Sequence, residues 1–249
     1  MRVLEYGKAN PKTMLFLPCT AEPEWAFTAS VTLLAQDYHV LQIVYDGHGE
    51  TGEDFISVEH TVEEIIGWLH DHGIFSLDAA YGCSLGGACL TRFLAAGEVT
   101  VEQAIFDGGI TPYQMPALLF RLACLRDFLG FKLLAGSRKL LEAAYPPEKY
   151  TLPGHDPVKE YDAMEQYLKS YSSRTIRNIF CLQIISACPR SLRRPPAVWS
   201  TGTAKRRKTP GARTSALSNS IFLRFARSAF PAWSTQSLCS STHRSFTAG

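Results

Sequence analysis

Short apolar runs alternate with amphipathic stretches over the first 110 residues. The apolar runs predict strands at Met14–Leu17, His39–Tyr45, Leu77–Tyr81 and Val101–Phe106. Helical spacing predicts helices at Trp25–Gln36, Val62–His70 and Ala88–Ala96, and Thr61 with Glu64 three residues on suggests a capping box for the second. Continuous apolar strands that alternate with helices are typical of a parallel sheet covered by helices on both faces. The loops that follow the strands then lie at one edge of the sheet.

The strand signals stop after Phe106, and residues 111–173 read as helical. Pro112 and Pro116 precede a stretch that interleaves charged residues with apolar ones, which predicts one apolar and one polar helix face. The apolar positions are Leu118, Leu119, Leu122, Leu125, Phe128 and Leu129. Two interpretations stay open. These leucines pack in the core, or they belong to a helical cap that lies over the carboxyl edge of the sheet and lines a substrate pocket.

The charge distribution changes abruptly along the chain. All 23 acidic residues lie between Glu5 and Glu165, together with 11 Lys and Arg, which gives a formal charge of −12. The last 84 residues hold 14 Lys and Arg and no acidic residue, which gives +14. The overall charge of +2 therefore describes neither part, and such a break calls for an explanation.

Two interpretations of the basic segment compete. A Ser- and Arg-rich arm with the run Lys205–Lys208 is typical of a disordered tail that binds nucleic acid. The alternative is translation in a shifted reading frame from near Phe180. Moving the frame back by one nucleotide permits a globular sequence at Cys181–Pro189, Tyr-Trp-Tyr-Gly-Glu at Thr201–Lys205, and an acid-containing stretch with Gly-Leu-Glu-His-Ala-Glu within Ala232–His243. We favour the frameshift, because these segments follow the order that a globular domain of this type needs.

Length and composition exclude several classes. A chain of 249 residues suits one α/β domain. Four charged residues interrupt the most apolar stretch, 118–134, so no membrane span is expected. Seven cysteines without a Cys-x-x-Cys pair favour reduced thiols and a cytoplasmic protein. Zinc-ligand spacing, a Walker lysine and a Gly-x-Gly-x-x-Gly loop are all missing from the sequence, so we expect neither a metal nor a nucleotide cofactor.

One motif carries chemistry. Gly82-Cys-Ser-Leu-Gly86 lies between a predicted strand and a predicted helix. In this strand–turn–helix context, Gly-x-Ser-x-Gly presents a serine hydroxyl above the carboxyl end of the sheet, and the small flanking residues let helix and strand approach closely. The pattern also arises by chance, but the strand before it, the helix after it and Gly87 favour a nucleophile elbow.

Residues 12–180 resemble the α/β-hydrolase superfamily in three features. The elbow is the first. Tyr45-Asp-Gly-His-Gly-Glu50 is similar to the Asp-x-x-Gly-His-Gly loop of many members, and Leu15–Thr20 stands where members place His-Gly and an oxyanion residue. Pro18 and Cys19 depart from that last pattern. The resemblance implies a three-layer α/β core with a helical cap, from which the C-terminal strands are missing.

The resemblance also assigns roles. Ser84 is the expected nucleophile, and the amide of Leu85, with that of Thr20 or Cys19, forms the expected oxyanion hole. A serine hydroxyl needs a histidine base that a carboxylate orients. Asp107, at the end of a strand, is a candidate acid or a turn cap beside Gly108–Gly109, since members usually place the acid one strand later.

A base histidine is not identifiable in the chain as written. We expect His48 to hold its loop through backbone bonds and His155 to be solvated. His243 lies in a segment without strand or helix signal and stays unassigned.

The predicted organisation is a hydrolase core at 1–110, a cap at 111–180 and an out-of-frame, disordered tail at 181–249. The predicted function is hydrolysis of a small ester or thioester through an acyl-enzyme, impaired by the lost base. The alternatives are a nucleic-acid-binding protein that works through its tail, and a non-catalytic hydrolase-like protein.

Overall fold

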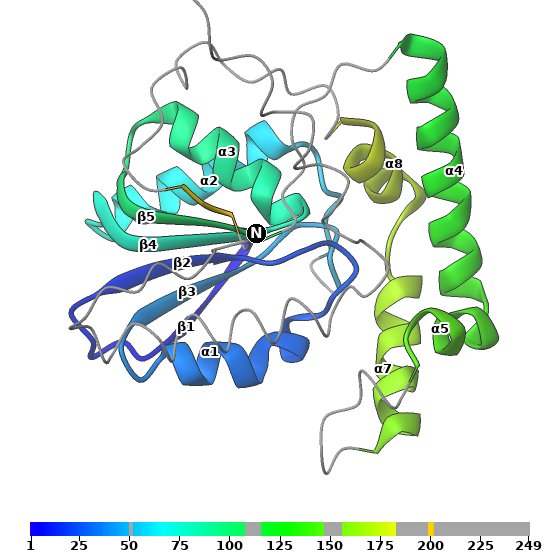
Figure 1. Ribbon diagram of the computed structural model, residues 1–249, viewed down its shortest axis with the longest axis horizontal. Helices are drawn as coiled ribbons and strands as arrows, with labels where there is room; N and C mark the ends of the chain where they lie inside the picture. The colour runs from blue at the N-terminus through cyan, green and yellow to red at the C-terminus, as the bar shows by residue number, and fades with distance from the viewer. Residues whose placement is uncertain (50–51, 108–115, 147–155, 183–198, 202–249) are drawn as a thin grey trace, which may run out of the picture.

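The computed structural model describes residues 1–49, 52–107, 116–146, 156–182 and 199–201, and these form a sheet with helices around it (Figure 1). Its strand order is β1-β3-β2-β4-β5-β6. The strands are β1 (Arg2–Tyr6), β2 (Thr13–Leu17), β3 (His39–Val44), β4 (Ser76–Cys83), β5 (Thr100–Asp107) and β6 (Trp199–Thr201). The helices are η1 (Glu24–Phe27), α1 (Thr28–Leu34), α2 (Val58–Asp71), α3 (Leu85–Ala96), α4 (Ala117–Gly136), α5 (Arg138–Ala144), α7 (Pro157–Lys169) and α8 (Ser173–Leu182).

Five of the strands run parallel, four of which (β2, β3, β4 and β5) the sequence predicts, and β1 pairs with β3 in the opposite direction. β1 was not predicted from the sequence. Its residues are half-buried or exposed because it lies at the edge of the sheet, so it lacks the continuous apolar run of the inner strands. The fold class is confirmed: a mostly parallel sheet lies between helical layers.

The inner strands send alternate side chains into two separate cores. In β2, Leu15 and Leu17 pack with α2 and α3, while Met14 and Phe16 pack with η1 and α1 on the opposite face. Figure 1 shows α2 and α3 on one side of the sheet and α1 on the other. This two-sided burial explains why β2 reads as an unbroken apolar run.

The predicted cap of α2 is wrong by four residues. Ser57, not Thr61, is the N-cap: its backbone is extended (φ −163°, ψ 168°), and its hydroxyl accepts the backbone N–H of His60 at 3.1 Å. Thr61 lies within the helix, where its hydroxyl donates to the carbonyl of Ser57. Both serine and threonine favour N-caps. Val58 and Val62 are both buried on the same helix, so the helix has to begin before Val58, and Ser57 is the residue at that point.

Of the predicted apolar positions of α4, Phe128 packs against the core, while the leucines do not. Phe131, Ala135 and Cys124 are buried, and α4 lies against α8 along that side. The predicted leucines lie on the opposite side, and Leu122 and Leu129 remain 54% and 50% exposed. The helix carries apolar stripes on two sides, so the sequence periodicity alone could not decide between them.

The cap docks on the core through α8. The Thr175 hydroxyl accepts the N–H of Phe55 at 3.1 Å, and Asn178 donates to the carbonyl of Phe55 at 2.8 Å. Thr175 is fully buried and also donates to Asp54 at 3.2 Å. These bonds satisfy polar groups that burial would otherwise leave without partners, so they fix where the cap sits.

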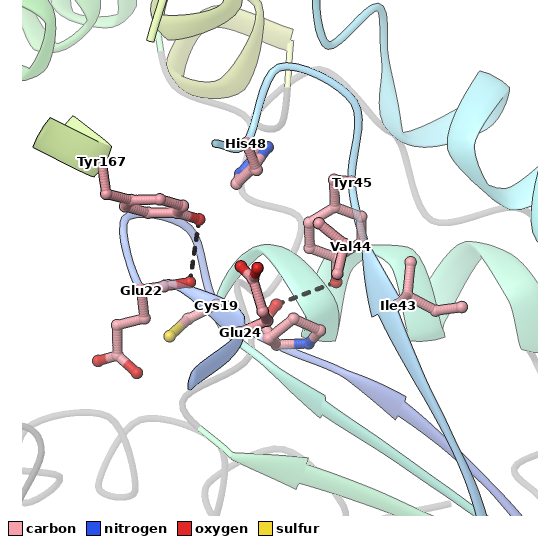
Figure 2. Close-up of a pocket in the computed structure, with 9 residues that line it drawn as sticks. Cys19, Glu22, Glu24, Ile43, Val44, Tyr45, His48 and Tyr167 are labelled. Carbon is pink, nitrogen blue, oxygen red and sulfur yellow. Dashed lines mark hydrogen bonds between the residues drawn. The ribbon is translucent and has the colours of Figure 1, made fainter. Parts of the chain in front are cut away.

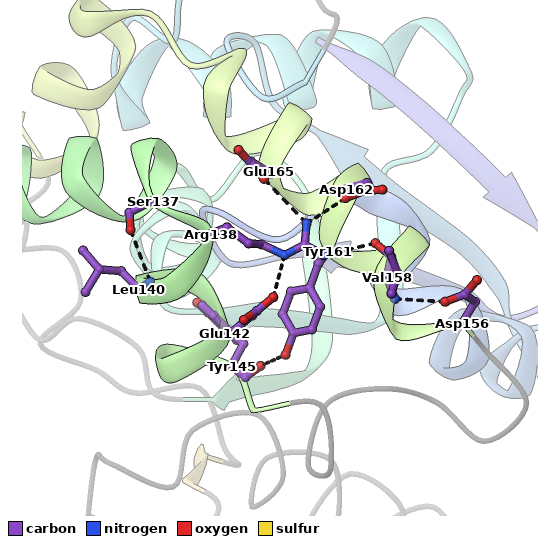
Figure 3. A network of polar contacts seen from close by, with 10 residues as sticks. All are labelled: Ser137, Arg138, Leu140, Glu142, Tyr145, Asp156, Val158, Tyr161, Asp162 and Glu165. Atoms are coloured by element: carbon purple, nitrogen blue, oxygen red, sulfur yellow. Dashed lines mark hydrogen bonds and ion pairs between the residues drawn. The ribbon is translucent and has the colours of Figure 1, made fainter.

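Arg138 ties α5 to α7 inside the cap (Figure 3). Its guanidinium is 2.8 Å from Glu142, 2.7 Å from Asp162 and 3.5 Å from Glu165, and it lies 4.8 Å from the ring centroid of Tyr161. Each exposed pair contributes little alone, but one guanidinium that pairs with carboxylates of both helices orients α5 and α7 relative to each other.

One short strand lies in the segment where the sequence analysis expected no strand. Trp199–Thr201 forms β6 and pairs in parallel with Ala104–Phe106 of β5. The missing-strand prediction therefore does not hold at these three residues. The other residues of the predicted tail from 183 on, His243 among them, lie outside the described residues, and so does His155. The frameshift and the predicted disorder stay predictions.

Candidate active site

Ser84 occupies a strained turn between β4 and α3. Its backbone has φ 49° and ψ −108°, and it is one of only two described residues other than glycine with positive φ. An L-residue in such a conformation costs about 1–3 kcal/mol and persists only where the surroundings enforce it. The N–H of Ser84 bonds to the carbonyl of Asp107 at 3.2 Å, which links the turn to the end of β5.

The glycines of the motif are explained by close backbone contacts. A Cβ on Gly82 would lie 2.4 Å from the carbonyl oxygen of Gly86, and a Cβ on Gly86 would lie 2.0 Å from that of Leu17. Real Cβ atoms do not approach other atoms so closely. The start of α3 therefore lies directly against the ends of β2 and β4, which is the close approach that the sequence analysis expected of an elbow.

The first turn of α3 leaves donors free for a ligand. Ser84 is the N-cap residue, but its side chain makes no cap hydrogen bond, so its hydroxyl is not used by its own helix. The first N–H groups of a helix have no intrahelical partner, and the helix dipole favours negative charge beside them. The Leu85 amide belongs to this set, which makes it suitable for stabilising an oxyanion.

The second predicted donor lies on the loop after β2, residues 18–22, which we call the β2 loop. Tyr45 donates to the carbonyl of Pro18 at 2.9 Å, and the Thr20 hydroxyl lies 3.1 Å from Nε2 of His48. Ala21 has φ 64°, the other strained residue of the described chain. The β2 loop thus holds both Cys19 and Thr20 in a defined conformation beside the elbow.

His48 is fully engaged as a support of the β2 loop. Its Nδ1 lies 3.0 Å from the carbonyl of Asp46 and so carries the proton, which leaves Nε2 to accept from the Thr20 hydroxyl. The side chain is 2% exposed, and this burial lowers the pKa of His48 to about 4. The imidazole is therefore neutral, with both ring nitrogens used.

Asp107 lies beside the elbow, but its carboxylate has another partner. It is the register partner of Cys83, and its Oδ2 accepts the hydroxyl of Tyr81 at 2.8 Å. Burial raises the pKa of Tyr81, so this phenol stays protonated and donates. Among the described histidines, none bonds to Asp107.

Cys19 and Glu22 add a polar cluster to the β2 loop that the sequence analysis did not predict. The contact with Cys83 and then burial raise the pKa of the Cys19 thiol well above its usual value. Burial, followed by the charge of Asp107, raises the pKa of Glu22 against the lowering contact with Cys19. A protonated, buried thiol is a poor nucleophile, so Cys19 can serve through its amide only.

No described histidine is hydrogen-bonded to the Ser84 hydroxyl. The five have other surroundings: His39 bonds to Glu5, His48 to Thr20 and Asp46, His60 pairs with Glu64, His72 bonds to the carbonyl of Trp68, and His70 lies against the ring of Phe75. The described residues therefore place Ser84 at a strained turn beside helix N-terminal amides, with none of the five histidines bonded to it.

A small, partly open pocket lies next to the β2 loop (Figure 2). It is lined by Pro18, Cys19, Glu22, Glu24, Ile43, Val44, Tyr45, His48 and Tyr167. Ser84 is not among the lining residues. In Figure 2 the ring of Tyr167 lies over the β2 loop, and its hydroxyl reaches the carbonyl of Glu22 at 3.0 Å.

The tyrosines that contact the β2 loop were not predicted from the sequence. Tyr167 and Tyr171 reach it from the cap, about 150 positions away in the sequence. Tyr167 lies in the last turn of α7, and Tyr171 lies just past its C-cap Ser170. No local signal could have shown that both side chains meet the β2 loop.

The described residues show neither a metal centre nor a membrane span. Within them, no group of three or more His, Cys, Asp and Glu side chains could hold a metal ion. No helix of the same set has both the length and the apolar character needed to cross a bilayer.

Comparison with solved structures identifies the fold as that of the α/β hydrolases. Similar structures include an alpha/beta hydrolase family protein from Desulfitobacterium hafniense (19% identity, TM-score 0.52, covering 73% of this chain and 72% of that one). MenH from S. aureus (17%, 0.52, 73% and 69%) and an esterase from Exiguobacterium antarcticum (18%, 0.52, 73% and 68%) are also similar. No protein-family model and no curated protein sequence matches the chain. At these identities the likeness shows the fold alone.

Proposed function

We propose that the protein is a serine hydrolase of small ester or thioester substrates. The observation that carries this proposal is the strained backbone of Ser84 at the start of α3. Strain of this kind concentrates at functional residues, because a relaxed turn would not present the side chain in the same way. The esterases among the similar structures support the substrate class.

In the proposed reaction, Oγ of Ser84 attacks the carbonyl carbon of the substrate. The carbonyl oxygen becomes an oxyanion that accepts hydrogen bonds from the amide of Leu85 and from that of Thr20 or Cys19. Collapse of this intermediate releases the alcohol or thiol and leaves an acyl group on Ser84, which water then removes. Each amide donor contributes about 3–4 kcal/mol to the transition state in enzymes of this kind.

The proton of Ser84 needs an acceptor, and here the proposal predicts a weak enzyme. The described histidines make other contacts, so activation of Ser84 by a base is not supported among them. Loss of a triad histidine can lower turnover by about a millionfold. Asp107 remains the candidate acid. Its carboxylate accepts the Tyr81 hydroxyl here, and it would orient a histidine encoded by the restored reading frame.

The direct test is covalent labelling with a fluorophosphonate probe. We expect slow labelling of the wild type, none of Ser84→Ala and wild-type labelling of Ser76→Ala. Ser76 is the matched control because it is exposed at the opposite end of the same strand. Labelling that survives in Ser84→Ala would contradict the assignment of the nucleophile.

The impairment is tested at the level of the gene. Restoring the frame by one nucleotide near codon 180 should encode a histidine followed by Ala-Glu and raise ester hydrolysis by orders of magnitude. An early stop codon in that frame, or a restored chain with unchanged activity, would refute the frameshift. Binding to DNA that weakens steeply with salt would then support the nucleic-acid-binding alternative.

We also propose a cytoplasmic location. Three cysteines of the described residues, Cys19, Cys83 and Cys89, are buried and form no disulfide. Reduced, buried thiols of this kind are typical of a reducing compartment.

A further inference from the structure

Two cap tyrosines and the β2 loop form a closed chain of hydrogen bonds. The N–H of Ala21 donates to the hydroxyl of Tyr171 at 3.2 Å, and this hydroxyl donates to that of Tyr167 at 3.2 Å. The Tyr167 hydroxyl in turn donates to the carbonyl of Glu22 at 3.0 Å. This series of hydrogen bonds begins at the N–H of Ala21 and ends at the carbonyl of Glu22, the next residue of the loop. Each hydroxyl accepts one bond and donates the next, so the directions of all three bonds are consistent.

The surroundings hold Tyr171 rigidly. Its side chain is 2% exposed and contacts three rings, those of His48, Phe131 and Tyr167, at centroid distances of 4.9, 5.0 and 5.5 Å. His48 is the same residue that accepts from Thr20. The phenol therefore cannot turn away from the loop without disturbing both the cap and the support of Thr20.

The bond to Tyr171 falls where the β2 loop is strained. Ala21 has φ 64°, a conformation that L-residues rarely adopt and that an unsupported loop would leave. Because Thr20 and Ala21 share a peptide bond, relaxation of Ala21 would rotate the backbone next to the proposed oxyanion donor.

We propose that Tyr167 and Tyr171 are positioning residues, through which the cap fixes the β2 loop in the conformation that presents the amide of Thr20 or Cys19 to the oxyanion. This inference rests on the proposed function. It adds that the cap acts on the chemistry through the backbone of the loop, in addition to any contact that it makes with the substrate.

The test compares Tyr171→Phe and Tyr167→Phe with the control Tyr161→Phe. Tyr161 lies on α7, as Tyr167 does, and its hydroxyl also bonds to a backbone carbonyl, that of Tyr145, but within the cap. The first measurement is hydrogen exchange of a peptide spanning residues 18–24. We expect exchange in this peptide to become at least about tenfold faster in Tyr171→Phe and to stay unchanged in Tyr161→Phe, because only the former leaves the Ala21 amide without its partner.

The second measurement is the rate of fluorophosphonate labelling of Ser84, separated into the rate at saturating probe and the probe concentration that gives half of it. For Tyr167→Phe and Tyr171→Phe we expect the saturating rate to fall about 10- to 100-fold, with little change in the half-saturating concentration. This is the usual result of a small misplacement of catalytic groups. The double variant should be no slower than the slower single variant, because all three bonds act as one unit.

The outcomes separate the two proposals. Absence of Ser84-dependent labelling in the wild type refutes the proposed function, while the exchange measurement still decides whether the tyrosines hold the loop. Unchanged exchange in Tyr171→Phe, or an equal increase in Tyr161→Phe, overturns the inference. Faster exchange with an unchanged labelling rate overturns the positioning role, since the tyrosines would then only tether the loop.

Discussion

Burial of neutral His48 should make the stability of the protein depend on pH in the mildly acidic range. The imidazole is surrounded by the rings of Tyr45, Phe55 and Tyr171, and burial is the main cause that lowers its pKa to about 4. The bond to the Asp46 carbonyl and the charge of Asp46 oppose this effect without overcoming it. In the unfolded chain the pKa of this histidine returns to about 6.5.

The size and direction of the effect follow from these two pKa values. Between pH 6.5 and 4 the unfolded chain binds a proton at His48 that the folded protein does not, so stability falls as the pH falls. The contribution is fully present above pH 6.5. From pH 7.5 to pH 5 the loss amounts to about 2 kcal/mol, and it reaches about 3 kcal/mol below pH 4.

Urea unfolding at several pH values between 7.5 and 5 measures this loss, with His48→Gln as the comparison. Glutamine can bond to Thr20 and Asp46 but does not titrate, while all other groups, including the carboxyl of Glu22, are common to both proteins. We expect the stability difference between wild type and variant to shrink by about 2 kcal/mol on going from pH 7.5 to pH 5. Parallel stability curves would show that His48 titrates normally and is not buried as described.

Three further predictions concern the elbow and the cap. Ser84→Gly should raise stability by about 1 kcal/mol, because glycine adopts a positive φ without strain, whereas Ser84→Ala should not; equal thermal midpoints for the two variants would refute the strain. Gly86→Ala should destabilise by more than about 3 kcal/mol or prevent folding, since the new Cβ would meet the backbone of Leu17, and denaturant unfolding checks this; a change below 1 kcal/mol would contradict the close contact. Phe131→Ala should cost about 3–5 kcal/mol in the same assay and Leu122→Ala about 0.5 kcal/mol or less, and the reverse order would mean that the other face of α4 is the packed one.

The sequence by itself determined the core of the fold and the place of the nucleophile. Strands buried on both faces must be mostly apolar, so β2, β3 and β4 could be located within a few residues. β5 is mostly half-buried or exposed, and its apolar residues on either side of Glu102 and Gln103 still located it. The elbow was equally readable, because the contacts of Gly82 and Gly86 exclude any side chain at both positions. Both are local requirements: a buried strand needs apolar residues, and a close backbone contact needs glycine. Each requirement is therefore visible in the sequence at the residues concerned.

Only the tertiary structure decided which surfaces meet. The edge strand β1 and the three-residue strand β6 depend on pairing with residues far away in the sequence, so neither shows a signal of its own. The same reason explains α4, whose two apolar stripes are equivalent until α8 packs against one of them. It also explains the support of the β2 loop by Tyr167 and Tyr171, because a hydrogen bond across about 150 residues requires only a phenol at the right place in space, and nothing in the neighbouring sequence records where that place is.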